Sequence, residues 1–184
     1  MPYRSKKKEI LITTAEELFY QNGFHAVGID YIIAESGVAK MTLYKHFKSK
    51  DDLIMTVLEH ASQRIIQWLE RETDRLSLTD EMRIDALFDA HEHWFREHHF
   101  KGCLFARACA EYPDPEMPIH QMAERHFRNV FRVVERQASL AGAKDPANTA
   151  ENIMVLLEGA KALAFAASAP IAARRAKRVA KSLL

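Results

Sequence analysis

The sequence has few of the residues that mark several common protein classes. Cysteine occurs only as Cys103 and Cys109, which gives no disulfide framework and fits a reducing cytoplasm. Glycine and proline occur six times each among 184 residues, so little of the chain is expected to be disordered. No apolar run reaches the roughly 18 residues of a transmembrane helix, and the basic N-terminus leads into an amphipathic segment. The sequence therefore predicts neither a membrane span nor a secretory signal.

Catalytic and metal-binding patterns are also lacking. There is no nucleophile elbow, phosphate-binding loop or paired-carboxylate pattern, so we expect neither an enzyme nor a cofactor. The histidine-rich segment 91–99 is the one candidate for a metal site. Metal-binding histidines on a helix are usually four positions apart, but here only His91 with His98 or His99 shares a face, and such a pair spans two turns. We therefore expect no metal.

Charge is distributed unevenly along the chain. Residues 1–50 hold eight basic and five acidic side chains, residues 51–170 hold thirteen and twenty, and residues 171–184 hold five and none. A positive N-terminal segment on an acidic body is typical of a compact DNA reader joined to a separate module. The hydrophobic content of 48% is ample for a buried core.

Apolar residues recur with helical spacing throughout, and no strand, repeat or low-complexity segment competes with an all-α fold. Gly23 and Gly142 are expected to end helices, and Asp145 followed by Pro146 is expected to begin one. Helices are predicted at about 5–22, 29–36, 39–47, 50–75, from 79 to beyond 95, 102–112, 118–141, 146–167 and 170–183.

The segment Gly37–Lys50 carries the most specific pattern. A short apolar helix precedes Gly37, which can turn the chain, and the helix that follows has only Leu43 and Phe47 to bury. Its other side carries lysine, threonine, tyrosine and histidine side chains, which suit phosphate oxygens and base edges. This pattern favours a DNA-reading helix-turn-helix over a merely solvated amphipathic helix.

Residues from about 9 to 58 resemble the DNA-binding domain of the tetracycline-repressor (TetR) family. The matching pieces are Ile10-Leu, Ala15-Glu-Glu-Leu-Phe19, Asn22-Gly-Phe24 and Gly37-Val-Ala-Lys-Met-Thr-Leu-Tyr-Lys-His-Phe47, which leads into Lys50-Asp-Asp-Leu53. Two positions depart from the pattern. Met41 stands where the family usually has glycine, and Gly28 where a serine or threonine often caps the second helix. Met41 could add an apolar contact, for instance to a thymine methyl group.

The resemblance implies a three-helix DNA-binding domain at 1–49 and a larger helical domain for effector binding and dimerisation at 50–184. It places Tyr44, His46 and Lys50 at phosphates. It places Lys40, Thr42 and Lys45 nearer base edges. With Met41, the candidate DNA-binding residues are Lys40, Met41, Thr42, Tyr44, Lys45, His46 and Lys50.

The expected function is a homodimeric transcription regulator, of the repressor type, that a small molecule releases from a palindromic operator on double-stranded DNA. The last two long helices are the expected dimer surface, with Gly159, Ala160, Ala164 and Ala167 permitting close approach and Leu156 and Leu163 supplying apolar area. His91 is expected to be buried on an apolar stripe, either as a core residue or in a cavity for a mainly apolar effector. The candidate effector residues are His91, Trp94, Phe95, Phe105, Phe127 and Phe131.

Several alternatives stay open from the sequence. The protein could bind DNA without any effector, in which case the C-terminal interior would be filled. The run Arg174–Arg178 could be a second nucleic-acid patch or the exposed side of the last helix. Cys103 and Cys109 could form a thiol switch, although small buried hydrophobic residues are the commoner case.

Overall fold

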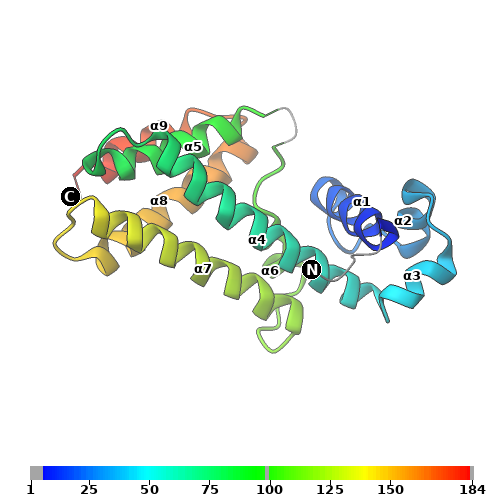
Figure 1. Ribbon diagram of the computed structural model, residues 1–184. Coiled ribbons are helices and arrows are strands. Elements are labelled where there is room, and N and C mark those ends of the chain that lie inside the picture. Colours follow the sequence, from blue (N-terminus) through cyan, green and yellow to red (C-terminus); the bar gives the residue numbers. More distant parts are fainter. Residues whose placement is uncertain (1–5, 98–99, 183–184) are drawn as a thin grey trace. The chain divides into compact units, whose positions relative to one another are not determined.

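The structure of the chain is a computed structural model that describes residues 6–97 and 100–182, and all regular structure in these ranges is helical (Figure 1). This confirms the all-α fold class. The helices are α1 (Lys6–Asn22), α2 (Ile29–Ser36), α3 (Lys40–His46), α4 (Lys50–Leu76), the 3-10 turn η1 (Asp80–Met82), α5 (Arg83–Phe95), α6 (Leu104–Glu111), α7 (Pro118–Leu140), α8 (Pro146–Ala166) and α9 (Ala172–Ala180).

The first of two compact units contains residues 1–63 and 104–126, and is thus discontinuous in sequence. Within it, α1, α2 and α3 contact one another in the blue-to-cyan part of Figure 1. Their core is built from fully buried apolar side chains, because each helix presents one apolar face to the other two. These residues include Leu11, Ala15, Phe19, Ile32 and Leu43.

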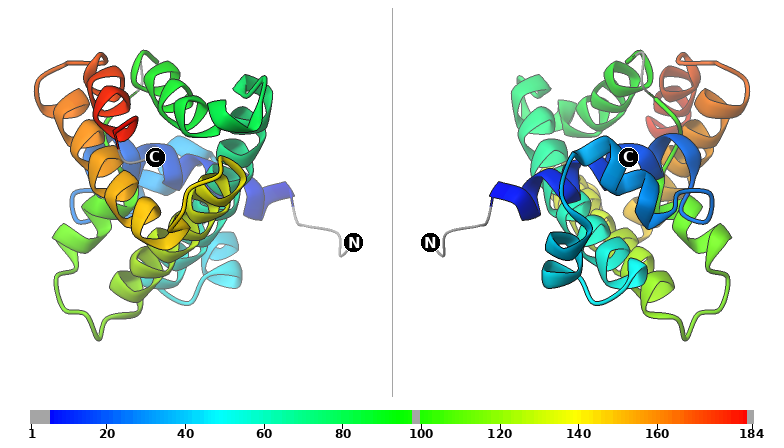
Figure 2. Two further views of the ribbon diagram at one scale, coloured as in Figure 1. Left: turned by 90° about the vertical axis from the view of Figure 1, so that its left-hand side faces the viewer. Right: turned by 90° about the vertical axis from the view of Figure 1, so that its right-hand side faces the viewer.

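The second unit contains residues 64–103 and 127–184. Its core combines the end of α4 with α5, the second part of α7, α8 and α9. Both views in Figure 2, like Figure 1, show α9 in red alongside α8 in orange and α5 in green. The side chains that α9 buries are all alanines, namely Ala172, Ala173, Ala176 and Ala180. Alanine lets the helix backbone approach its neighbours closely but removes little apolar area from water.

The predicted cap at Asp145 is confirmed, because its carboxylate accepts a hydrogen bond from the Asn148 N–H at 3.1 Å. At the start of α4, the Ser49 hydroxyl accepts a hydrogen bond from the Asp52 N–H at 3.1 Å. The last helix begins at Ala172 and not at Pro170, because residues 167–171 form a turn in which Ser168 has a φ of 48°. Predicted helix ends elsewhere differ by one to a few residues.

The expected dimer surface on α8 is partly wrong. Ala160 and Ala164 are buried in the core of the second unit, so they cannot meet another chain. The face of α8 left exposed carries Val155 and Leu163, with Gly159 between them. Small residues permit close helix approach inside one chain as well as between chains, so composition alone did not choose the face.

Two residues of the histidine-rich segment considered as a metal site, His98 and His99, lie outside the described ranges. Among the residues that the structure does describe, no three histidine, cysteine or acidic side chains are grouped so that they could hold a metal ion. In the same ranges no helix is long and apolar enough to cross a membrane.

Candidate nucleic-acid interface

The turn between α2 and α3 is fixed by local chemistry. Gly37 adopts the left-handed conformation at φ 64°, and its N–H donates to the Ile33 carbonyl, which closes α2. In α3, the Leu43 side chain is buried, as is Phe47 directly after the helix. Burial of such side chains contributes about 1.5–3 kcal/mol each. The predicted apolar side of this helix is therefore confirmed, and it fixes which face is left for DNA.

The opposite face of α3 is open to solvent. Met41 is 82% exposed and Tyr44 is 47% exposed, which is unusual for large apolar and aromatic side chains on a small domain. Lys40 and Lys45 are exposed, while Thr42 and His46 are partly buried. Lys50, the first residue of α4, is also partly buried, and this burial lowers the pKa of its ammonium group. The structure thus brings six of the seven candidate residues onto one short helix, with Lys50 at the start of the next.

Lys40 has an acidic partner within the protein. Its Nζ lies 2.8 Å from the Asp30 Oδ1 at the start of α2, and this hydrogen bond raises the pKa of Lys40. Both side chains are exposed, so the pair is weakly held and solvent-screened. Any other acceptor for Lys40 would have to displace the Asp30 carboxylate from its ammonium group.

Gly28 occupies the N-cap position of α2. It has an extended conformation, with φ −84° and ψ 158°, and makes no side-chain capping hydrogen bond. An added Cβ there would meet nothing within 4 Å. The space around Gly28 would therefore also admit a serine or threonine side chain.

A clamp between α6 and the turn after α1 was not foreseen from the sequence. The Glu111 carboxylate at the end of α6 accepts hydrogen bonds from the N–H groups of Phe24 at 3.1 Å and His25 at 2.7 Å. The His25 Nε2–H donates to the Glu111 carbonyl at 2.8 Å, and the Arg107 guanidinium donates to the Tyr20 carbonyl at 2.9 Å. These contacts, all within the first unit, attach α6 to the turn between α1 and α2.

Gly23 makes this close approach possible. Its φ of 91° lies in the left-handed region, and a Cβ placed there would come within 2.6 Å of the Glu111 Oε1. From the sequence alone, Gly23 was predicted only to end the first helix. A glycine at the end of a helix, followed by free backbone N–H groups, indicates a place where a carboxylate can approach the backbone. It does not indicate which of the acidic residues of the chain approaches there.

The candidate effector residues divide between the two units. His91, Trp94 and Phe95 lie together on α5, with Trp68 of α4 and Phe100 completing the group. Phe131 packs against the same core, and Phe127 is partly buried in the same unit. Phe105 belongs to the first unit, where its ring stacks on His126 with a centroid distance of 3.5 Å.

His91 is buried, as its place on the apolar stripe predicted. It is only 2% exposed, and its Nδ1–H donates to the Leu87 carbonyl at 2.7 Å. Burial, with the positive charge of Lys161 as the second cause, lowers the pKa of His91 to about 3. The ring is therefore neutral at physiological pH.

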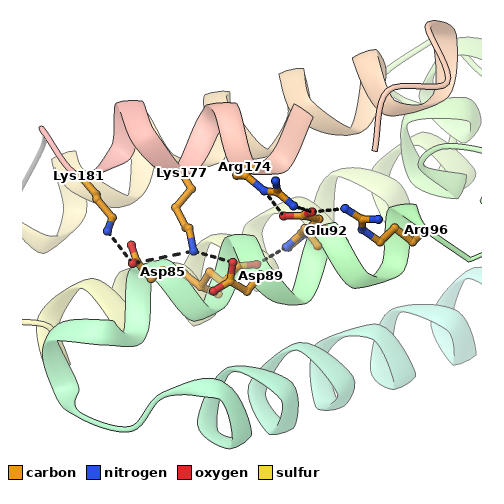
Figure 3. Close-up of polar contacts among 9 residues, drawn as sticks. Asp85, Asp89, Glu92, Arg96, Arg174, Lys177 and Lys181 are labelled. Atoms are coloured by element: carbon orange, nitrogen blue, oxygen red, sulfur yellow. Dashed lines mark hydrogen bonds and ion pairs between the residues drawn. The ribbon is translucent and has the colours of Figure 1, made fainter. Parts of the chain in front are cut away.

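Two basic residues of α9, together with Lys181 directly after it, pair with acidic residues of α5 in a regular ladder (Figure 3). Arg174 contacts Glu92 at 2.6 Å, Lys177 contacts Asp89 at 2.6 Å, and Lys181 contacts Asp85 at 2.9 Å. The rungs run antiparallel at helical spacing. Within the segment Arg174–Arg178, Arg174 and Lys177 therefore form ion pairs within the chain. Arg175 and Arg178 lie on the exposed side of the last helix, which was one of the two interpretations of this segment.

Comparison with known proteins agrees with this arrangement. Residues 11–57 match the bacterial regulatory proteins of the tetR family, and residues 81–180 match the tetracyclin repressor-like C-terminal domain. The chain belongs to the TetR family. A solved structure of the TetR-family transcriptional regulator SCO4454 from Streptomyces coelicolor is 30% identical, covers 98% of this chain and 95% of its own, and superposes with a TM-score of 0.88.

Curated relatives of this TetR-family chain are DNA-binding regulators. The HTH-type transcriptional regulator YjdC of Escherichia coli is 28% identical over 117 residues, or 64% of this chain. The HTH-type transcriptional activator FasR of Mycolicibacterium smegmatis is 28% identical over 143 residues, or 74% of this chain. This chain spans 61% of the length of YjdC and 63% of the length of FasR. The shared property is DNA-binding transcription regulation by a helix-turn-helix domain.

Proposed function

We propose that the protein is a cytoplasmic, homodimeric repressor that reads a palindromic operator with α3 and is released by a small-molecule effector. The observation that carries the DNA-reading part is the exposed face of α3, where Met41 and Tyr44 stand out from a helix whose opposite side is buried. Residues 1–49 supply this reading head, and residues 50–184 the effector and dimer functions. One helix of seven residues reaches few bases, and two copies on a palindrome double them.

The second copy would pack against α8 and α9. Val155, Leu163 and Phe165 of α8 and Val179 of α9 are exposed, although each is apolar. A pair of such helices from each chain forms a four-helix bundle, which removes these side chains from water. The proposed contact uses the face of α8 that carries Val155 and Leu163, and not the buried Ala160 and Ala164.

The proposed effector centre is the aromatic group around His91, Trp94 and Phe95. Aromatic and apolar walls with a few polar groups are typical of small-molecule sites. A ligand there releases DNA only by binding the DNA-incompetent conformation better, and about 1–3 kcal/mol of coupling gives 5- to 150-fold relief. Helix α4, whose residues 50–76 continue from the first unit into the second, offers the covalent connection to the DNA-binding domain.

The test begins with selection of operator DNA from genomic fragments by the purified protein, followed by binding to the selected site. Tyr44→Ala and Lys50→Ala should weaken binding to most sequences about equally, and Lys50→Ala, which removes a positive charge, should lower the salt slope by about one unit. Lys40→Ala and Thr42→Ala should relax the preference at particular base pairs. Four variants that all bind like wild type would refute α3 as the reading helix.

Oligomeric state is tested separately by sedimentation at micromolar concentration. We expect a dimer that Leu163→Glu splits, because a carboxylate cannot be desolvated in an apolar contact. The matched variant Glu151→Gln, on the same helix but at its solvent-exposed start, should remain dimeric. A monomeric wild type would refute the dimer proposal.

A further inference from the structure

Met41 is the most exposed large apolar residue in the described part of the first unit. It is 82% exposed on α3, whereas Ile10, Tyr31 and Tyr44 are between 38% and 47% exposed. Leu43, two positions further along α3, is fully buried, and two positions correspond to roughly 200° around a helix. Met41 therefore points away from the core of the three-helix domain and into the space that DNA would occupy.

The neighbours of Met41 on the helix surface are other candidate DNA-binding residues. Tyr44 and Lys45 follow three and four positions later, so they lie on the same face of α3, and both are exposed. Their hydroxyl and ammonium groups suit phosphate oxygens and the acceptors of base edges. The face thus places one fully apolar side chain beside polar ones, and Met41 needs a different kind of partner on the DNA.

The position of Met41 along α3 favours contact with a base. In a helix-turn-helix, the N-terminal residues of the reading helix contact the base edges. In α3 these residues are Lys40, Met41 and Thr42. Lys40 pairs with Asp30 at 2.8 Å, and Thr42 is partly buried. Met41 has the most open position of the three, and its unbranched thioether chain adapts its shape to a neighbouring group.

The chemistry of methionine restricts which feature of a base Met41 recognises. A thioether has no N–H or O–H group and is only a weak acceptor. In the major groove the base pairs present hydrogen-bond donors and acceptors, and the apolar group among them is the C5 methyl of thymine. Contact with a donor or an acceptor would remove water from that group without replacing the hydrogen bond, which costs free energy. Contact with a methyl group instead removes apolar surface from water, which is favourable.

We propose that Met41 is a specificity-determining residue that recognises a pyrimidine 5-methyl group in each operator half-site. This inference rests on the proposed reading of DNA by α3, and it names what one residue of that helix selects. Two bases carry this group at the same place in the major groove, namely thymine and 5-methylcytosine. Uracil and unmethylated cytosine lack it. A 5-methylcytosine at that position would make operator affinity depend on DNA methylation.

The first experiment removes the methyl group alone. In the operator selected from genomic fragments, each thymine is replaced singly by uracil, and the affinity of the full-length protein is measured by fluorescence anisotropy at fixed salt. We expect one position in each half-site at which uracil lowers affinity about three- to tenfold, the effect of burying one methyl group. In Met41→Ala the same replacement should lower affinity less than about 1.5-fold, because the alanine side chain ends too far from the base.

Two further variants serve as controls. Met82→Ala removes another exposed methionine, in the 3-10 turn of the second unit, and should leave the uracil effects as in the wild type. Met41→Leu keeps an apolar chain and should retain most of the uracil effect. The comparison of wild type with Met41→Ala on both DNAs is a double-mutant cycle, which cancels any effect of uracil on DNA shape. Equal uracil effects in these two proteins at every thymine would exclude thymine as the base that Met41 recognises.

The second experiment replaces each operator cytosine singly by 5-methylcytosine. A gain of about three- to tenfold at one position, absent in Met41→Ala, would identify methylated cytosine as the recognised base. No Met41-dependent response in either series would overturn the proposal. If the wild type then still binds its operator selectively, the reading of DNA by α3 stands without this role of Met41. A wild type that selects no operator at all would overturn the proposed function together with this inference.

Discussion

Helices α3 and α9 look alike in sequence but differ in what their charges meet. Both are short and basic, and both bury a narrow stripe, Leu43 in α3 and alanines in α9. Two cations of α9, with Lys181 directly after it, face three acidic residues of α5 (Figure 3). In α3, Lys40 pairs with Asp30, and among residues 6–97 and 100–182 no other cation of this helix forms an ion pair. A basic helix is thus available to DNA only when its neighbours do not supply the counter-charges.

The largest effect that separates the two helices is expected in DNA binding. Lys45→Ala should lower operator affinity about 10- to 100-fold at fixed salt, because a lysine at a base edge contributes about 1–3 kcal/mol. Arg178→Ala, its matched control on α9, should change affinity less than about twofold. Fluorescence anisotropy with operator DNA measures both. An equal loss in the two variants would show that α9 also contacts DNA.

Breaking the ladder should act on stability. The Glu92 side chain is nearly buried and accepts from Arg174 and Arg96, both at 2.6 Å. Glu92→Gln should lower the free energy of unfolding by about 1–2 kcal/mol, the lower half of the range for a buried charged hydrogen bond because both arginines are half exposed. Urea denaturation checks this, and Glu151→Gln on the exposed start of α8 should cost less than about 0.5 kcal/mol.

The pH dependence of that difference identifies its cause. Arg174, and after it Arg96, hold the pKa of Glu92 below its usual 4.5. A depressed folded-state pKa gives stability that is present above the unfolded-state pKa and lost as pH falls through the folded-state value. The stability gap between wild type and Glu92→Gln should be constant at pH 6–8 and shrink below about pH 4.5. A gap that is unchanged at about pH 3 would assign the loss to packing and not to charge.

The smallest effect concerns Lys40, the α3 cation that pairs with Asp30. Asp30→Asn should free Lys40 and remove a negative charge beside the DNA, so affinity for non-specific DNA should rise, by less than about fivefold. Glu35→Gln, an exposed acid on the same helix, is the control and should change affinity less. Weaker binding by Asp30→Asn would mean that Asp30 positions Lys40 for DNA instead of competing with DNA for it.

Local patterns predicted much of the fold and of the DNA-binding face. Gly37 and the spacing of Leu43 and Phe47 indicated the turn and the buried side of α3, and the structure shows both. The Asp145 cap and the burial of His91 were also predicted correctly. These features depend on residues within about two turns of one another, where φ restrictions and helical periodicity decide the geometry.

By itself, then, the sequence determined the helices, the Asp145 cap, the buried side of α3 and the family. The tertiary structure alone decided which chemically equivalent partner each side chain meets. It selected Glu111 for the turn after Gly23, and it paired Asp85, Asp89 and Glu92 with the cations of α9. It also buried Ala160 and Ala164 and set Phe105 against His126. The helical period of a sequence predicts which face of a helix is buried, but not which other helix packs against that face. Contacts between residues more than eighty positions apart depend on how the helices pack together.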